Sequence, residues 1–383
     1  MRLSSSPWSS GSAAVLETPA PRPTQRKTPA VGLPKPLASL GKHDGGTRHS
    51  GRSAASLPTR RAQRRYAVVL TVLLVLAAGF AFGLLAWGNP MPVGSDGFWR
   101  IAQMRGTSVV VMAVVAVCQA MATVSFQTAT NNRIITPSIM GFESLYIAVQ
   151  TGAVFFLGAA GVTAVQGVPQ FVLQIFIMVG LSMALYGWLL SGKYGNLHVM
   201  LLVGIIIGGG LGSVSAFMQR LLTPSEFDVL TARLFGSVTN ADVSYLPIAI
   251  PLCVGAGVLL LLNSRRLNII ALGSDTATGL GLNHRREVMR VLFLVSILMA
   301  TSTALVGPMT FLGFLVATLA YQLADTFDHR LVFPIAALVG FVVLSGSYFV
   351  MKNVFYAEGV VSIIIEVVGG SVFLFFILRK GRL

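Results

Sequence analysis

The feature that most constrains this chain is a series of apolar stretches after residue 65, each roughly 18 to 25 residues long and separated by short polar connections. A helix rises about 1.5 Å per residue, so each stretch can cross the roughly 30 Å hydrocarbon layer of a bilayer. Apolar residues make up 54% of the chain and charged residues only 11%, and a water-soluble fold would expose too much apolar surface. The sequence therefore predicts an all-α, polytopic membrane protein with about ten transmembrane helices in residues 66–383.

Residues 1–65 are a different kind of segment, rich in Ser, Pro, Thr and Gly and carrying much of the formal net charge of +15. The segment has no apolar periodicity and cannot bury enough surface to offset its conformational entropy, so we expect a disordered basic tail. Its Arg60 to Arg65 cluster suits the anionic inner leaflet of a membrane, but a topogenic flank or a wrongly assigned start codon is the favoured interpretation. Because the charge concentrates in this tail, nucleic-acid binding is not predicted.

The distribution of Lys and Arg predicts that both termini are cytoplasmic. The basic residues expected on the inside are Arg133, Lys193, Arg265, Arg266, Arg285, Arg286, Arg290, Arg330, Arg379, Lys380 and Arg382. The outer connections hold fewer, among them Arg105 and Lys352, and these lie near acidic residues. The span from Phe311 to Leu323 is short and is the one most easily miscounted.

Two connections are expected to form short helices. Outside, Thr223-Pro-Ser-Glu226 offers an N-cap, a proline at the first helical position and a capping-box glutamate. Inside, the Gly273 to Gly281 stretch has a capping serine, Ser274, an acid in its first turn and glycines that can end a helix. This coupling region, about residues 264–288, is a plausible docking element for another protein.

Two polar motifs lie between predicted spans. Amides and hydroxyls near the end of the second span can line a gate, or they can hydrogen-bond the backbone groups of a broken helix. A Gly-Pro turn follows the seventh span near the predicted outer surface. A structural loop or turn is the favoured interpretation of each, and a pathway role is the alternative. The candidate pathway or gate residues are Gln127, Asn131, Asn132, Pro137, Gly307, Pro308, Thr310 and Gly313.

The fifth span carries Gly204, Gly208 and Gly212 at four-residue spacing, which places three positions without side chains on one helix face. Such a face lets a second backbone approach closely. Packing within the chain is at least as well supported as a subunit interface.

Two acidic residues fall within predicted spans, Glu366 deep in the tenth and Glu143 nearer the inner end of the third. A charge in lipid is costly, so such a residue suggests a function. Proton coupling through Glu366 is one interpretation, and a protonated or hydrogen-bonded packing residue is the favoured one.

No catalytic motif is evident, so the chain is not expected to be an enzyme. It has no G-x-x-x-x-G-K-[ST] loop, and any ATP must therefore be hydrolysed by a separate polypeptide. Its cysteines and histidines form no ligand cluster, and no metal site is predicted. His198, His284 and His329 fall at predicted cytoplasmic edges, where solvation at the interface is the expected explanation.

Three segments together resemble the FecCD-type permeases of siderophore, haem and cobalamin ABC importers, over roughly residue 66 to the end. They are Gln127 to Gly141, Leu272 to Gly281, and Gly307 to Gly313 running on to Asp328-His329-Arg330 and Pro334. The first, with Asn131-Asn-Arg-Ile-Ile-Thr-Pro-Ser-Ile-Met-Gly141, is most similar to the second permease subunits of catecholate systems such as those for vibriobactin and petrobactin.

The resemblance implies a subunit of a ferric-siderophore importer in the bacterial cytoplasmic membrane. A second permease, expected to differ from this chain although a homodimer is the alternative, would enclose the pathway. Two cytoplasmic ATPases would use ATP and Mg, and an extracytoplasmic binding lipoprotein would deliver the chelate. The chain itself is expected to bind no cofactor.

The resemblance also assigns roles by position. The coupling helix that docks the ATPase would contain Gly273, Asp275, Ala277, Leu280 and Gly281. Arg105 and Lys352 match basic positions that meet acids on the binding protein, where charge pairing favours orientation. The chain departs from the family at Arg105-Gly-Thr-Ser108, where a basic-Leu-Pro-basic run is usual, and at Val316-Ala-Thr318, where Val-Pro-His is usual.

Other functions remain open from the sequence. An ion- or proton-coupled secondary transporter would use Glu366 for coupling, a FecCD-type permease could instead carry haem or cobalamin, and a membrane scaffold would carry nothing. ATP-dependent accumulation of substrate is expected only of an importer, so transport by the reconstituted complex separates these classes.

Overall fold

The computed structural model describes residues 56–191, 197–235, 237–238, 241–355 and 361–380. The predicted tail up to residue 55, Lys193 and Arg382 lie outside these ranges. Within them the chain forms helices and turns, and no strand.

Ten helices follow the order of the predicted spans. They are α1 (Arg60–Ala86), α2 (Asp96–Ala129), α3 (Glu143–Ala164), α4 (Val168–Ser191), α5 (Leu197–Arg220), α7 (Leu246–Leu262), α10 (His284–Val306), α11 (Leu312–Ala324), α12 (His329–Asn353) and α13 (Val361–Lys380). Between them lie η1 (Ser138–Phe142), α6 (Pro224–Leu234), η2 (Val243–Tyr245), α8 (Ser264–Ile270) and α9 (Ser274–Gly279). Among the described residues, eight helical segments are long and apolar enough to cross a membrane, and α11 and the Val361–Ser371 part of α13 are shorter apolar helices.

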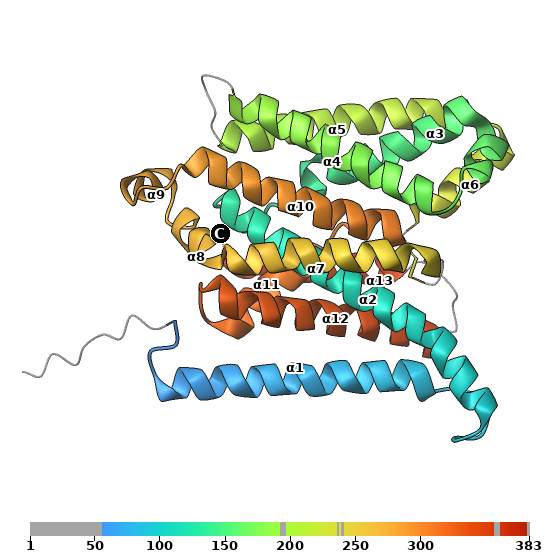
Figure 1. Ribbon diagram of the computed structural model, residues 1–383, viewed down its shortest axis with the longest axis horizontal. Coiled ribbons are helices and arrows are strands. Elements are labelled where there is room, and N and C mark those ends of the chain that lie inside the picture. Colours follow the sequence, from blue (N-terminus) through green and yellow to red (C-terminus); the bar gives the residue numbers. More distant parts are fainter. Residues whose placement is uncertain (1–55, 192–196, 236, 239–240, 356–360, 381–383) are drawn as a thin grey trace, which may run out of the picture. The chain divides into compact units, whose positions relative to one another are not determined.

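Helices α2 and α10 form the centre of the bundle. Their most apolar windows are 78% and 72% buried, whereas that of α1 is only 17% buried, so α1 lies at the periphery. Helices α10 and α12 both pack on α2, α1 packs on α12, and α4 and α7 pack on α10. Figure 1 shows α3, α4 and α5 together on one side of α10, and α12 and α1 on the other.

The first helix begins earlier than the sequence predicts. Residues Arg60 to Arg65, expected in the tail, form the first turns of α1, because the Thr59 hydroxyl caps the helix by accepting a hydrogen bond from the Ala62 amide at 3.1 Å. Arg65 also pairs with Asp325, in the turn between α11 and α12, at 2.6 Å. The polar cap and this ion pair extend the helix beyond its apolar part.

The third span is broken near its start, which its apolar run does not indicate. Within η1, Met140 and Gly141 leave helical geometry, and Gly141 has a φ of 96° that L side chains rarely adopt. The break packs directly on α5, since a Cβ at Gly208 would lie 2.8 Å from the Gly141 Cα and a Cβ at Gly204 would lie 2.7 Å from the Met140 side chain. Gly204 and Gly208, two of the three glycines on one face of α5, thus pack against the chain's own backbone. A Cβ added at the third, Gly212, would meet no described residue within 4 Å.

The short helix expected after Thr223 is confirmed as α6. The Glu226 carboxylate accepts a hydrogen bond from the Thr223 amide at 2.9 Å, completing the capping-box contact. This bond and a second one from the Thr223 hydroxyl lower the pKa of Glu226.

We expect acid to loosen the start of α6. The folded form holds the Glu226 pKa below its ordinary value, so the cap stabilises the helix above the ordinary range of a glutamate. That stabilisation is lost as the pH falls through the lowered pKa. The protection factors of the α6 amides in hydrogen exchange, which correct for the intrinsic pH dependence of exchange, should therefore fall on acidification, and Glu226→Gln should remove most of this pH dependence. An equal loss of protection in both proteins would contradict the assignment.

Candidate functional site

The Gly273 to Gly281 stretch folds into a short, outward-facing helix at one end of the bundle. Gly273 and Gly281 have φ values of 94° and 84°, which bracket α9 with turns. Ala277 is completely buried and anchors the helix, while Leu280 is 60% exposed. Ser274 is not the cap that the sequence predicts, since Gly273 occupies the N-cap and the Ser274 hydroxyl instead donates to Asp275. With Gly273 as the N-cap, the helix starts at Ser274, one residue earlier than the sequence predicts.

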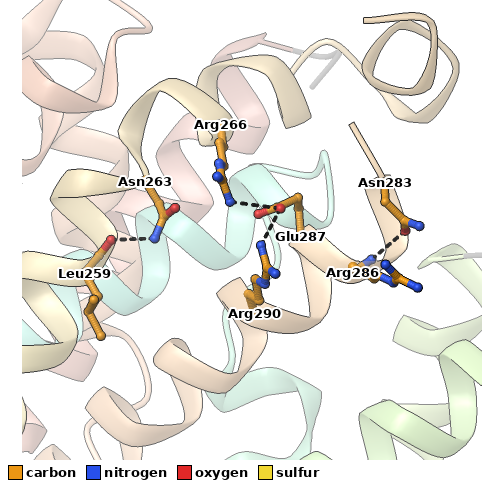
Figure 2. Close-up of polar contacts among 7 residues, drawn as sticks. All are labelled: Leu259, Asn263, Arg266, Asn283, Arg286, Glu287 and Arg290. Atoms are coloured by element: carbon orange, nitrogen blue, oxygen red, sulfur yellow. Dashed lines mark hydrogen bonds and ion pairs between the residues drawn. The ribbon is translucent and has the colours of Figure 1, made fainter. Parts of the chain in front are cut away.

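A charge cluster that the sequence did not single out ties this region to the bundle. Figure 2 shows Glu287, in the first turn of α10, between Arg266 of α8 and Arg290 of α10. Its Oε1 lies 3.1 Å from the Arg266 Nη1 and 2.7 Å from the Arg290 Nη1. Glu287 is 8% exposed, so a mostly buried carboxylate joins the segment before α9 to a central helix. The link depends on a contact across 21 residues that no local pattern indicates.

Glu287→Ala should lower the free energy of unfolding by about 1 kcal/mol, because two arginines lose a shared partner although solvent screens both of them. Glu287→Gln should lose less, since its amide oxygen still accepts a hydrogen bond. Thermal melting of the purified chain in detergent measures both changes. Equal stability of wild type and the alanine variant would contradict the role of this cluster.

The predicted gate loop after α2 is a compact turn held by its own amides. The buried Gln127 side chain donates to the Arg133 carbonyl at 2.7 Å, and the Asn132 side chain accepts from the Ile134 amide at 2.9 Å. Asn131 adopts a left-handed φ of 50°, and Pro137 immediately precedes η1. The loop therefore has a defined shape that leads directly into the broken third span.

The Gly307 turn is buried where α10 ends, at the end of that helix farther from α9. Gly307 has a φ of 86° and lines a cavity there, and the Thr310 hydroxyl donates to Glu143 at 2.6 Å. Helix α11, which follows the turn, has 13 residues and spans only about 20 Å. The turn before α11 contacts the start of α3 through Thr310 and Glu143.

This contact brings together residues that the sequence treats separately. Glu366 of α13 is close enough to Glu143 to interact with it electrostatically. The neighbouring Gly313 packs so closely on α2 that a Cβ there would lie 2.2 Å from the Thr123 hydroxyl oxygen. Pro308 is half-buried in the same turn. Glu143 and Thr310 thus form a polar contact within the apolar bundle, and the exposed Glu366 lies on the helix α13 nearby.

A cavity of about 480 Å³ lies at the end of the bundle away from α9, between α3, α4, α6 and the end of α10. Its lining is rich in amides, with Gln150 donating to Gln174 at 2.9 Å, and it includes Arg233 and a stacked pair of rings, Phe171 and Tyr245. Burial lowers the pKa of Arg233, whose charge is thereby partly desolvated. The cavity gives this end of the bundle a polar interior.

Arg105 holds the connection between α1 and α2. Its guanidinium donates to the Trp87 carbonyl at 2.8 Å and to the Gly88 carbonyl at 3.1 Å. Helix α2 has 34 residues and is about 51 Å long, longer than the predicted span, which places Arg105 on a helix where a loop was expected. Lys352 is exposed on the last turn of α12.

Comparison with known proteins gives consistent matches. The model of the FecCD transport family matches residues 67–379. The petrobactin import system permease protein FatC of Bacillus anthracis is 51% identical over 340 residues, covering 89% of this chain and 96% of that protein. The petrobactin import system permease protein YclO of Bacillus subtilis strain 168 is 35% identical, covering 69% and 84%.

A solved structure shares the fold. An inward-facing metal-chelate type ABC transporter matches with a TM-score of 0.70 at 22% identity, covering 82% of this chain and 99% of that chain. At this identity the match establishes the arrangement of helices alone.

Proposed function

Because the chain belongs to the FecCD transport family, we propose that it is the membrane-spanning permease of an ATP-driven importer whose cargo is a ferric siderophore. The proposed cargo is supported by the 51% identity to a petrobactin permease over nearly the whole of both chains. Haem and cobalamin, the other cargoes of the resembling permeases, are competing substrates in the test below.

The proposed motor contact is α9. A six-residue helix with one buried anchor and an exposed leucine at its end can insert into a groove of an ATPase. We assign this contact to Gly273, Asp275, Ala277, Leu280 and Gly281. The α9 end of the bundle, and with it the start of α1, would then be cytoplasmic.

The remaining partners follow from the same proposal. A second permease, different from this chain, would cover the open face of α5 around Gly212, where a Cβ would meet no described residue within 4 Å. A binding lipoprotein would dock at the opposite end, near Lys352 and the long α2. Arg105 would position the loop before α2 for that contact.

In the proposed cycle, the chelate enters a cavity between the two permeases from the lipoprotein side. ATP binding and hydrolysis displace α9, and Glu287 transmits this movement to α10 through Arg266. The Gly307 turn and the Gln127 to Arg133 loop, at two depths of the bundle, act as alternating gates. Each state must bind the ATPase differently for ATP to drive the cycle.

Reconstitution tests the proposal. Vesicles containing this chain, its partner permease and the ATPases, with the binding protein outside, should accumulate labelled ferric siderophore when ATP is inside. A non-hydrolysable ATP analogue is the control and should abolish accumulation. Accumulation driven by a proton gradient without ATP would instead support a secondary transporter, and ATP-dependent uptake of haem or cobalamin in place of the siderophore would overturn the cargo.

A further inference from the structure

A second polar joint connects the region of α9 to the bundle, and it centres on a buried histidine. His329, the first residue of α12, is only 2% exposed. Its Nδ1 lies 2.6 Å from the Asn268 Oδ1 in α8, and its Nε2 lies 2.6 Å from the Thr128 hydroxyl near the end of α2. One ring therefore bridges α8 and α2 from a third helix, which solvation at a membrane edge does not explain.

The positions of the hydrogen atoms in this series of bonds follow from Asp328, which lies at one end of it. Burial acts to raise the pKa of Asp328, but hydrogen bonds from the Ser56 hydroxyl, the Asn268 amide and the Arg330 amide together lower it, so Asp328 is a carboxylate. A carboxylate only accepts, and the Asn268 NH₂ group therefore faces it at 3.0 Å. The Asn268 carbonyl is then left to accept from His329.

This orientation fixes the histidine. Its Nδ1 carries the proton donated to the Asn268 oxygen, and in the neutral ring the Nε2 lone pair accepts the Thr128 hydroxyl proton, for which the Val124 carbonyl at 2.9 Å is the competing acceptor. The Asn268 oxygen also accepts from the His329 backbone amide at 3.1 Å. The hydrogen bonds thus run without a break from Asp328 through Asn268 and His329 to Thr128, and each group in the series has a donor or acceptor role that matches its neighbour's.

At its Thr128 end, this series of hydrogen bonds reaches the gate loop. Thr128 lies 3.4 Å from the Tyr321 hydroxyl of α11, and the Arg133 guanidinium lies over the Tyr321 ring at 4.8 Å. Gln127, next to Thr128, holds the Arg133 carbonyl. At its Asn268 end, the series lies on α8, which leads through Gly273 into α9.

The buried residues of α8 other than Ser264 are apolar, namely Leu267 and Ile270. Apolar contacts are non-directional and tolerate sliding, whereas two short hydrogen bonds on opposite sides of one ring fix relative position. We infer that His329 is a positioning residue for transport, which makes the cytoplasmic gate loop at the end of α2 follow the displacement of α8 and α9. This inference rests on the proposed function, because it requires α9 to be moved by an ATPase.

The test measures siderophore transported per ATP hydrolysed in the reconstituted complex. His329→Leu and Asn268→Leu should each lower this ratio by about tenfold while leaving the rate of ATP hydrolysis nearly unchanged. The double variant should fall no further, because both changes break the same joint. Ser345→Ala is the control, since Ser345 is a buried hydroxyl of the same helix that bonds only carbonyls of its own helix, and it should keep the wild-type ratio.

Thr128→Val guards against misfolding, because it keeps the volume of the side chain and removes one hydroxyl, which contacts His329, the Val124 carbonyl of its own helix and, at 3.4 Å, the Tyr321 hydroxyl. It should lower the ratio in the same direction, and His329→Gln, whose amide oxygen can still accept from Thr128, should recover part of the loss in His329→Leu. A wild-type ratio in the variants, or hydrolysis and transport falling by the same factor, would overturn the role of His329. Absence of ATP-driven transport in the wild-type complex would instead overturn the proposed function.

Discussion

Leu280→Glu should reduce ATP-dependent import by about thirtyfold or more, the largest loss we expect from a single surface change. Leu280 caps the end of α9 and is 60% exposed, so it contributes little to the stability of the chain itself. A charge at the centre of a docking contact would be desolvated without a partner, which disfavours binding of the ATPase. Co-purification of the ATPase with the permease and vesicle uptake measure the two consequences.

Val93→Glu is the matched control. Val93 is 87% exposed in the connection between α1 and α2, at the opposite end of the bundle, and the change has the same chemistry. It should leave ATPase binding intact. Retention of the ATPase by Leu280→Glu at wild-type strength would contradict the docking role of α9.

Gly208→Val should destabilise the chain by about 1 to 3 kcal/mol, because its added atoms would meet backbone and not a side chain that can turn away. A Cβ there lies 2.8 Å from the Gly141 Cα, and Gly141 itself is held at a φ that few residues tolerate. The α5 helix and the η1 break would have to separate. Thermal melting and the yield of folded protein in detergent should both fall.

Gly212→Val provides the comparison within the same glycine stripe. No residue in the described part of the chain, apart from the neighbouring backbone of α5 itself, lies within 4 Å of the Gly212 Cβ position, so the melting temperature of the isolated chain should not change. Loss of pairing with the second permease in this variant, with an unchanged melting temperature, would place the subunit interface on this face. Equal destabilisation by both variants would show that the contact with Gly141 does not matter.

The spans could be read from the sequence because each depends on local quantities, apolar length and the residues that end a helix. The same holds for α6, where Thr223, Pro224 and Glu226 suffice to predict both existence and start. Helix α9 was predicted for the same reason, although its cap moved from Ser274 to Gly273.

The contacts between distant segments could not be read in this way. The pairing of Thr310 with Glu143 joins residues 167 apart in the chain, and that of His329 with Thr128 joins residues 201 apart. An apolar run reveals that a helix crosses a membrane but not which neighbours it meets. For that reason a histidine expected at a solvated edge proved to be a buried bridge between helices.

The shortness of α11 has a consequence for how the protein is made. Its leading turn, with Gly307 and Thr310, carries polar groups into the bundle, and the last helix covers it, since Gly369 of α13 lies against Phe311. During synthesis the face of this turn that α13 covers therefore stays open until the last helix has been inserted, so α13 completes the enclosure of polar groups that a bilayer cannot hydrogen-bond.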